Sequence, residues 1–226
     1  MAKKQSRVDR LSECLYTVDR KVIPMNKFIV IEGLDGSGKS TVTKLLIEYF
    51  NSKWLPTVTT CEPTTENPIG DLIQNILSGE VKNIANETLA LLFAADRHHH
   101  LTNEIIPALA HSHVICDRYY LSSMAYQGID PASLERVIAY NQVAMDIHKP
   151  DIIFFLNVSP GECIRRVKAR GKEVSIFETL PKLELRYERY MTAIERMKKI
   201  DNIITVGSDT ASAEEVAAEM WEHIIK

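Results

Sequence analysis

The chain has 226 residues, of which 45% are hydrophobic and 25% charged, a composition typical of a single globular domain and not of a disordered chain. Its formal net charge of -3 argues against a protein that holds nucleic acid through bulk positive charge. The four cysteines are far apart and form no C-x-x-C pair, so we expect no metal site or disulfide framework and a reducing, cytoplasmic location. No apolar run approaches the roughly 20 residues that a membrane span needs.

Residues 1–24 precede the first predicted strand and mix six basic with three acidic residues. They contain no apolar core like that of a secretory signal, and the acidic residues argue against a transit peptide. We therefore expect an N-terminal extension, either a surface arm or a short helix, in front of one domain at 25–226.

The stretch from Phe28 to Thr41 carries the clearest signal. Residues 28–31 form an apolar, β-branched run, typical of a buried parallel strand. Residues 33–40 fit G-x-x-x-x-G-K-[ST] without a mismatch, and 41–50 carry apolar residues at helical spacing. The motif thus lies between a strand and a helix, which is the context that identifies a phosphate-binding loop.

The residue types of this loop suit phosphate chemistry. Backbone N–H groups of a tight loop and a helix N-terminus can face phosphate oxygens directly. Gly33, Gly36 and Gly38 keep side chains out of that approach. We expect Lys39 to reach the β- and γ-phosphates of a nucleotide and the Ser40 hydroxyl to bind Mg²⁺.

The rest of the chain alternates apolar strands with helices. Further strands are predicted at 57–60, 113–117, 151–158 and 203–206. Helices are predicted at 69–77, 86–110, 131–148, from 160 onward, 178–200 and 211–226, with a short one within 119–128. Asn86 is the expected N-cap of the long helix, and Pro107 should bend or end it. This order predicts a three-layer α/β fold, with a five-stranded parallel sheet flanked by helices.

Three residues outside the loop are candidates for chemistry. Asp117 ends a predicted strand, as does the aspartate that lies near the metal ion in P-loop proteins. Phe93 and Arg97 are spaced i, i+4, so an aromatic plane and a guanidinium could hold a flat heterocycle. Spacing alone favours the ordinary alternative, a core phenylalanine and a surface arginine.

Two groups of basic residues need separate interpretations. Consecutive helical residues point about 100° apart, so the histidines at 98–100 cannot converge on one metal ion, and we expect no metal role for them. The run at 165–172 holds five cations before the next acid at Glu173. It is either a solvated helix face or a lid that closes on nucleotide phosphates.

Four blocks together resemble the thymidylate kinases of the P-loop nucleoside monophosphate kinase group. They are EGLDGSGKST at 32–41, EPT at 62–64, LLFAADR at 91–97 and DRYYLSSMAYQ at 117–127. The resemblance spans residues 27 to about 226. It implies transfer of the γ-phosphoryl group of ATP to dTMP, giving dTDP and ADP, with Mg²⁺ as cofactor. It also implies small-molecule partners only, without nucleic acid or membrane, and a homodimer formed through the helix at 86–110.

The resemblance implies a role for individual residues. It assigns the ATP phosphates to Gly33, Leu34, Asp35, Gly36, Ser37, Gly38, Lys39, Ser40 and Thr41, and Mg²⁺ to Ser40 and Asp117. The substrate-binding residues that it implies are Glu62, Pro63, Phe93, Arg97, Arg118, Ser123, Tyr126 and Gln127. The catalytic residues that it implies are Lys39, Arg118, Arg170 and Asp35.

Within that set, the resemblance gives each acceptor residue a task. Phe93 is expected to stack on thymine, while Arg97 and Ser123 contact its edge. Arg118 is expected to hold the acceptor phosphate. Asp35 is expected to face the 3′-hydroxyl, and Tyr126 to crowd the 2′ position.

The expected lid, about 165–177, resembles the bacterial type. No cation stands at 34–37, whereas the lid holds Lys168, Arg170 and Lys172. It departs from that pattern at Ile176, where a second arginine is expected, and this puts turnover in doubt. Two alternatives stay open. One is a deoxynucleoside kinase, with Glu62 as base for a 5′-hydroxyl, or a kinase of another monophosphate. The other, motivated by Ile176, is a nucleotide-binding protein without efficient catalysis.

Overall fold

The computed structural model describes residues 26–65, 67–169, 179–207 and 209–226, and it places five parallel strands in one sheet. The strands are β1 (Phe28–Gly33), β2 (Thr57–Cys61), β3 (His113–Asp117), β4 (Ile152–Leu156) and β5 (Ile203–Val206). Their order across the sheet is β2-β3-β1-β4-β5, so β1 lies in the centre. The loop that follows β1 is therefore flanked by the carboxyl ends of β3 and β4.

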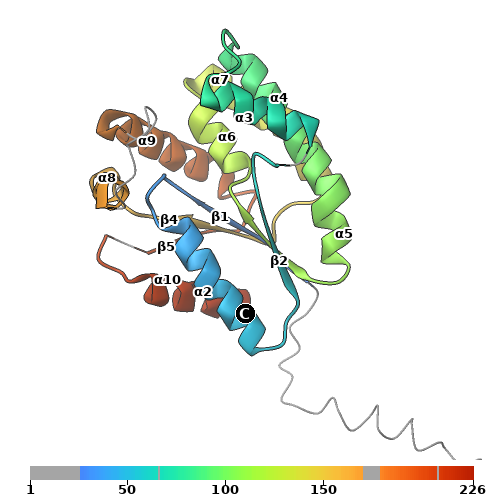
Figure 1. Cartoon of the computed structure of the whole chain (residues 1–226), viewed down its shortest axis with the longest axis vertical. Helices are drawn as coiled ribbons and strands as arrows, with labels where there is room; N and C mark the ends of the chain where they lie inside the picture. Colours follow the sequence, from blue (N-terminus) through green and yellow to red (C-terminus); the bar gives the residue numbers. More distant parts are fainter. Residues whose placement is uncertain (1–25, 66, 170–178, 208) are drawn as a thin grey trace, which may run out of the picture.

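Helices cover both faces of this sheet (Figure 1). They are α2 (Lys39–Ser52), α3 (Pro68–Ser78), α4 (Asn86–His100), the π-helix η1 (Leu101–Ile105), α5 (Ile106–Leu109), α6 (Tyr120–Gln127), α7 (Pro131–Ile147), α8 (Pro160–Ala169), α9 (Leu180–Met197) and α10 (Ala213–Ile224). In Figure 1, α2 and α10 lie on one side of the sheet and α4, α6, α7 and α9 on the other. The predicted three-layer α/β fold is confirmed.

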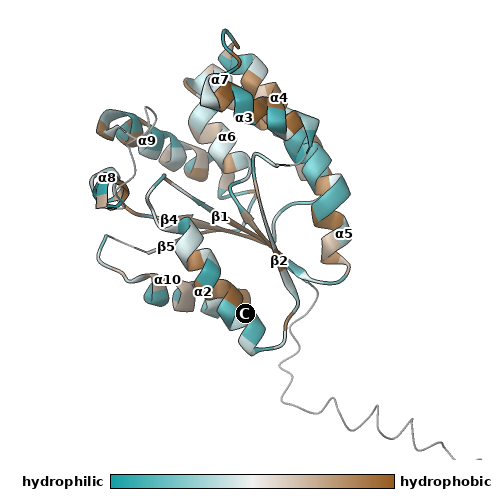
Figure 2. Cartoon of the chain, viewed as in Figure 1, coloured by the Kyte–Doolittle hydropathy of each residue, from teal (hydrophilic) through white to brown (hydrophobic). Residues whose placement is uncertain are grey.

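The central strand shows why the sheet needs two layers of helices. Successive side chains of a strand point to opposite faces, and all of those of β1 are buried. Phe28 and Val30 pack in the core beneath α6, α7 and α9. Ile29 and Ile31 pack in the second core, with α2 and α10. Figure 2 shows the strands as the hydrophobic centre of the molecule, as expected for a parallel sheet covered on both faces.

The long helix predicted at 86–110 differs from expectation in two ways. Asn86 is the first helical residue and Ala85 the N-cap, so the predicted cap is wrong; the Asn86 side chain instead donates to the Gln127 carbonyl at 2.8 Å. The helix also changes to a π-helix at 101–105, just before Pro107. Since proline has no N–H and its ring clashes with the carbonyl four residues earlier, the α-helical pattern cannot continue unchanged through this point.

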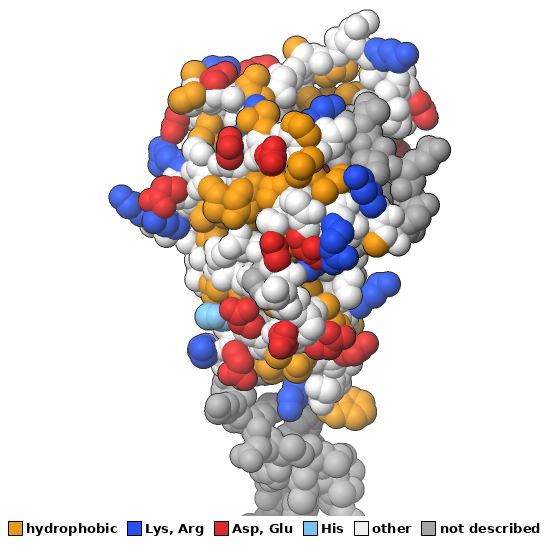
Figure 3. Space-filling model, turned by 90° about the vertical axis from the view of Figure 1, so that its left-hand side faces the viewer, with side chains coloured by type: hydrophobic (Ala, Val, Ile, Leu, Met, Phe, Trp, Pro, Cys, Tyr) orange, Lys and Arg blue, Asp and Glu red, His pale blue; other side chains and the backbone are white. Residues whose placement is uncertain are grey.

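The surface of the described residues carries charges of both signs. On the side shown in Figure 3, acidic and basic side chains are interspersed among hydrophobic ones. Within the described ranges, no helix is both long and apolar enough to cross a membrane. The expected extension at 1–24 and most of the expected lid lie outside these ranges.

Candidate active site

The loop between β1 and α2 has a backbone that requires glycine. Gly38, the N-cap of α2, has φ of 101°, in the left-handed region that favours glycine. Gly36 has φ of 88°, and a Cβ atom there would lie 2.5 Å from the Cys163 carbonyl oxygen. The loop is thus packed against α8, and the N-terminus of α2 directs N–H groups to the same point, a suitable arrangement for binding phosphate.

Lys39 is held against this loop. Its ammonium group donates to the carbonyl oxygens of Gly33 and Leu34, both at 3.1 Å, and the residue is almost fully buried. Burial lowers the pKa of Lys39 to about 8, and the positive charge of Arg118 acts in the same direction. A lysine that remains mostly protonated at neutral pH is therefore placed where nucleotide phosphates would lie.

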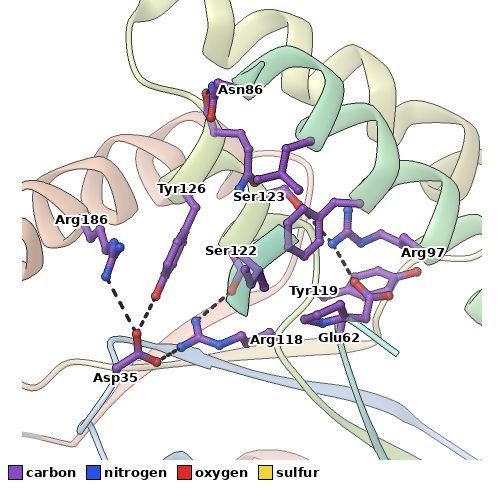
Figure 4. A pocket seen from close by; sticks show the side chains of 15 residues that line it. Asp35, Glu62, Asn86, Arg97, Arg118, Tyr119, Ser122, Ser123, Tyr126 and Arg186 are labelled. Atoms are coloured by element: carbon purple, nitrogen blue, oxygen red, sulfur yellow. Dashed lines mark hydrogen bonds and ion pairs between the residues drawn. The ribbon is translucent and has the colours of Figure 1, made fainter. Parts of the chain in front are cut away.

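A second group of side chains meets at Asp35 (Figure 4). Arg118, directly after β3, has φ of 69° and donates through Nη2 to Asp35 Oδ1. The Tyr126 hydroxyl donates to Asp35 Oδ2 at 3.1 Å, and Nη1 of Arg186 lies 4.0 Å from the same oxygen. Burial raises the pKa of Asp35, but Arg118 and Lys39 outweigh it and lower the pKa overall, so this carboxylate is anionic at neutral pH.

Glu32 lies fully buried beneath Arg118. Its Oε1 accepts the backbone N–H groups of Tyr119 and Ser122 at 2.8 and 3.0 Å. Its Oε2 accepts the hydroxyls of Ser122 at 2.6 Å and Tyr190 at 3.0 Å. Tyr119 is the N-cap of α6 and supplies no side-chain cap, so a carboxylate from β1 caps this helix. Burial raises the pKa of Glu32, although these hydrogen bonds and Arg118 oppose it.

A cavity of about 520 Å³ extends from Asp35 to Phe93 and Arg97. All eight predicted substrate-binding residues line it: Glu62, Pro63, Phe93, Arg97, Arg118, Ser123, Tyr126 and Gln127. Its volume lies within the range of about 300–1,000 Å³ that small-molecule sites have. Arg186, which the sequence analysis did not single out, also lines it.

The far end of the cavity contains a buried ion pair. Arg97 is only 1% exposed, so the surface position favoured by spacing alone is wrong for it. Its Nη2 lies 2.6 Å from Glu62 Oε2 and 3.2 Å from Ser123 Oγ. His100 Nδ1 lies 3.2 Å from the other Glu62 oxygen. The arginine can be buried because Glu62 neutralises it, and Phe93 is half-buried beside it.

The comparisons with known proteins identify the family. The family model described as "Thymidylate kinase" matches residues 31–219. The chain belongs to the thymidylate kinase family. A protein of Methanococcus aeolicus is 42% identical over 203 residues, covering 89% of this chain and 97% of its own. Proteins of Methanocaldococcus jannaschii (38%; 86% and 94%) and Pyrococcus abyssi (40%; 84% and 91%) are also similar, and all three are described as "Probable thymidylate kinase". Membership makes the chain an ATP-dependent kinase of nucleoside monophosphates.

A second cavity, of about 340 Å³, lies on the other side of the phosphate loop. It is lined by Ser37, Gly38 and Thr41, by residues of α8 and by the connection from β5 to α10. Arg166 Nη1 donates to the Ser37 carbonyl at 3.2 Å, whereas Arg165 is exposed and pairs with Glu162. The basic run is thus partly a solvated face and partly a contact with the loop. Arg170, Lys172 and Ile176 lie outside the described residues.

The candidate metal ligands of this kinase family member differ in exposure. Asp117 Oδ1 is buried and has no hydrogen-bond partner among the described atoms, while Ser40 is exposed in the first turn of α2. Of the histidines, His98 is exposed, and His100 is buried between Thr60 and Glu62. No group of three or more metal-binding side chains occurs among the residues described.

Three residues at the site were not predicted from the sequence: Glu32, Arg186 and Tyr190. Glu32 gave a signal, because it is a carboxylate inside an otherwise apolar strand. Arg186 and Tyr190 gave one too, because they share a helix face with Leu183 at i, i+3 and i+7. Neither signal says which distant residue is the partner.

Proposed function

We propose that the chain transfers the γ-phosphoryl group of ATP to dTMP, giving dTDP and ADP. The observation that carries this proposal is the cavity beside the phosphate loop, with Asp35 and Arg118 at the near end and Phe93 and Arg97 at the far end. Family membership supports the same reaction. Because both substrates then meet at one loop, catalysis consists mainly of positioning and charge stabilisation.

On the donor side, the loop residues 33–41 bind the ATP phosphates. Lys39 acts on the β- and γ-phosphates, for which its ammonium group is already held inside the loop. Arg166 supports the loop through the Ser37 carbonyl. The second cavity, beside Gly38 and Thr41, has room for the rest of the donor nucleotide.

Ser40 and Asp117 would hold Mg²⁺. When bound there, Mg²⁺ would neutralise the negative charge that develops on the donor phosphate. The buried, unpartnered Asp117 oxygen supports this assignment, since a buried polar atom normally has a partner. Such sites use only one or two carboxylates together with phosphates and water, so two protein ligands suffice.

On the acceptor side, Phe93 stacks on thymine, and Arg97 and Ser123 bind its edge. Arg97 Nε and Gln127 Oε1 are buried without hydrogen-bond partners among the described atoms, which supports binding of a base with donors and acceptors on its edge. Arg118 holds the acceptor phosphate. Burial raises the pKa of Tyr126 to about 12, so its phenol remains a protonated donor next to Asp35 at the sugar.

The lid and the assembly complete the proposal. We propose a lid of the bacterial type, in which Lys168, Arg170 and Lys172 supply positive charge to the nucleotide phosphates and Ile176 is tolerated. Of these four residues, the structure describes only Lys168. The protein acts as a homodimer through the helices at 86–110, on small molecules and not on nucleic acid or membrane. Three thiols, Cys61, Cys116 and Cys163, are free, which supports a reducing, cytoplasmic location.

A coupled ADP-release assay with ATP and Mg²⁺ tests the function. The acceptors are dTMP, dUMP, UMP and thymidine, each at a series of concentrations. We expect dTMP to have the highest kcat/KM, and UMP to react poorly because Tyr126 crowds the 2′ position. Equal rates for dTMP and UMP would contradict the assigned roles of the acceptor residues.

The two alternatives are separate outcomes of the same assay. If thymidine is the best acceptor, the chain is a nucleoside kinase and Glu62 becomes the candidate base. The pairing of Glu62 with Arg97 and His100, at the end of the cavity away from Asp35, argues against this. If no acceptor reacts while ATP binds, the chain is a nucleotide-binding protein.

A further inference from the structure

Helix α9 places an arginine, Arg186, at the near end of the cavity, beside Asp35. Leu183, Arg186 and Tyr190 share one face of this helix, and Leu183 and Tyr190 are fully buried. The Tyr190 hydroxyl lies 3.0 Å from Glu32 and 2.8 Å from Ser122, which fixes the helix against α6. Arg186, one turn before Tyr190, therefore lines the cavity, and its side chain is only 12% exposed.

Arg186 and Arg118 flank the same two groups. Arg118 contacts Asp35 Oδ1, and Arg186 Nη1 lies 4.0 Å from Oδ2. Both guanidinium carbons also lie over the Tyr126 ring, at 4.5 Å for Arg186 and 5.4 Å for Arg118. Figure 4 shows the two side chains approaching Asp35 from different elements. Two guanidinium groups and one carboxylate thus form the near end of the cavity.

The charges at this end explain why one arginine is insufficient. A phosphate monoester carries a charge of about -1.5 to -2 at neutral pH, and the anionic Asp35 repels it. The positive charge of Arg118 neutralises only the negative charge of Asp35 and leaves none over for the phosphate. The charge of Lys39 also acts on Asp35, but its ammonium group donates to the loop carbonyls. Arg97 is paired with Glu62 at the far end of the cavity, so neither group is placed to bind the acceptor phosphate directly.

We propose that Arg186 is a second acceptor-phosphate arginine, which binds the 5′-phosphate of the nucleoside monophosphate together with Arg118. This inference rests on the proposed function. The planar guanidinium suits a phosphate because its N–H groups can donate to two oxygens at once. Arg186 reaches the phosphate from α9, opposite the approach of Arg118 from β3.

The test compares a ligand that has the phosphate with one that lacks it. Affinities of dTMP and thymidine are measured by calorimetry for the wild type, Arg186→Met, Arg186→Lys and Arg189→Met. Arg189 is the matched control, an arginine on the same helix whose side chain does not line the cavity. We expect Arg186→Met to weaken dTMP binding about 10- to 100-fold. Thymidine binding should change less than about twofold, and Arg189→Met should match the wild type.

Two results overturn the inference. An equal loss of dTMP and thymidine affinity would assign Arg186 a structural role, and affinities like those of Arg189→Met would assign it none. If Arg186→Met does not fold, Arg186→Lys carries the same comparison, because it keeps the charge and loses the fork. A wild type that is inactive on dTMP refutes the proposed function instead, whereas an active wild type with an unchanged Arg186→Met variant refutes only this inference.

Discussion

At the scale of single residues, Lys39 gives a testable pH dependence. Burial and Arg118 lower its pKa to about 8, so near pH 8 about half of the nucleotide-free protein carries a neutral lysine. Bound phosphates favour the ammonium form and raise this pKa, so ATP binding should take up about half a proton at pH 8. Calorimetric titration of ATP in two buffers with different ionisation enthalpies measures the uptake.

The pH profile separates Lys39 from the nucleotide itself. A terminal phosphate ionises with a second pKa of about 6, so it is fully ionised at pH 8. Because Lys39 is almost fully protonated at pH 7, the uptake should grow from pH 7 to pH 8.5. The same titration with Lys39→Arg, which stays protonated, should show no uptake at pH 8. A constant or zero uptake in the wild type over this range contradicts the prediction.

The resemblance to a known family indicated eight substrate-binding residues but not their partners. All eight predicted residues line one cavity. The burial of Arg97 could not be derived from its spacing, because it depends on Glu62 at the end of another element. Glu32 likewise binds Tyr119, 87 residues away, and Tyr190, 158 residues away. Local periodicity carries no information on such pairs.

At the scale of elements, the short helix α6 depends on Glu32. Glu32→Ala leaves the N–H groups of Tyr119 and Ser122 without their acceptor, which should destabilise the fold by about 1–3 kcal/mol in urea unfolding. Because α6 carries Ser123 and Tyr126, the KM for dTMP should rise more than the KM for ATP.

The control for this helix is an exposed glutamate. Glu48→Ala, on the surface of α2, should change stability by less than about 0.5 kcal/mol and leave both KM values unaltered. If Glu32→Ala is as stable as the control, or raises both KM values equally, Glu32 does not act by capping α6. Glu32→Gln keeps the volume and one acceptor oxygen, so it should fall between the two.

Helix and strand positions could be predicted because each element shows the periodicity of its buried face. The exceptions are at helix ends and at Pro107. Asn86 has a side chain suited to an N-cap, but it is already the first residue of α4, and Ala85 is the N-cap. The Asn86 amide donates to the Gln127 carbonyl instead. The position of the proline indicated a disturbed helix, but whether the backbone bends, ends or forms a π-turn depends on packing.

At the scale of the whole molecule, the strand order explains how one loop can border two cavities. The sequence predicted five parallel strands without their order, because alternation of strands and helices does not determine which strands are neighbours. In the structure, β1 is central, with β3 and β2 on one side and β4 and β5 on the other. The cavity proposed for the acceptor lies at the ends of the first pair, where Arg118 and Glu62 line it. The second cavity lies at the ends of the other pair, where Leu156 and Gly207 line it.

The proposed homodimer makes the last prediction. Leu72, Leu91 and Ile106 are 38%, 48% and 37% exposed and belong to α3, α4 and α5, which lie along one side of the molecule in Figure 1. We predict that sedimentation equilibrium at micromolar concentration gives twice the chain mass of 25.6 kDa, and that Leu91→Asp gives a monomer. Leu91→Asp should prevent dimer formation because the dimer would have to bury an unpaired carboxylate at its interface.

Val143→Asp, at an exposed site on α7, is the control and should stay dimeric. A 25.6 kDa wild type rejects the dimer, and a dimer disrupted by Val143→Asp but not by Leu91→Asp assigns it to another face.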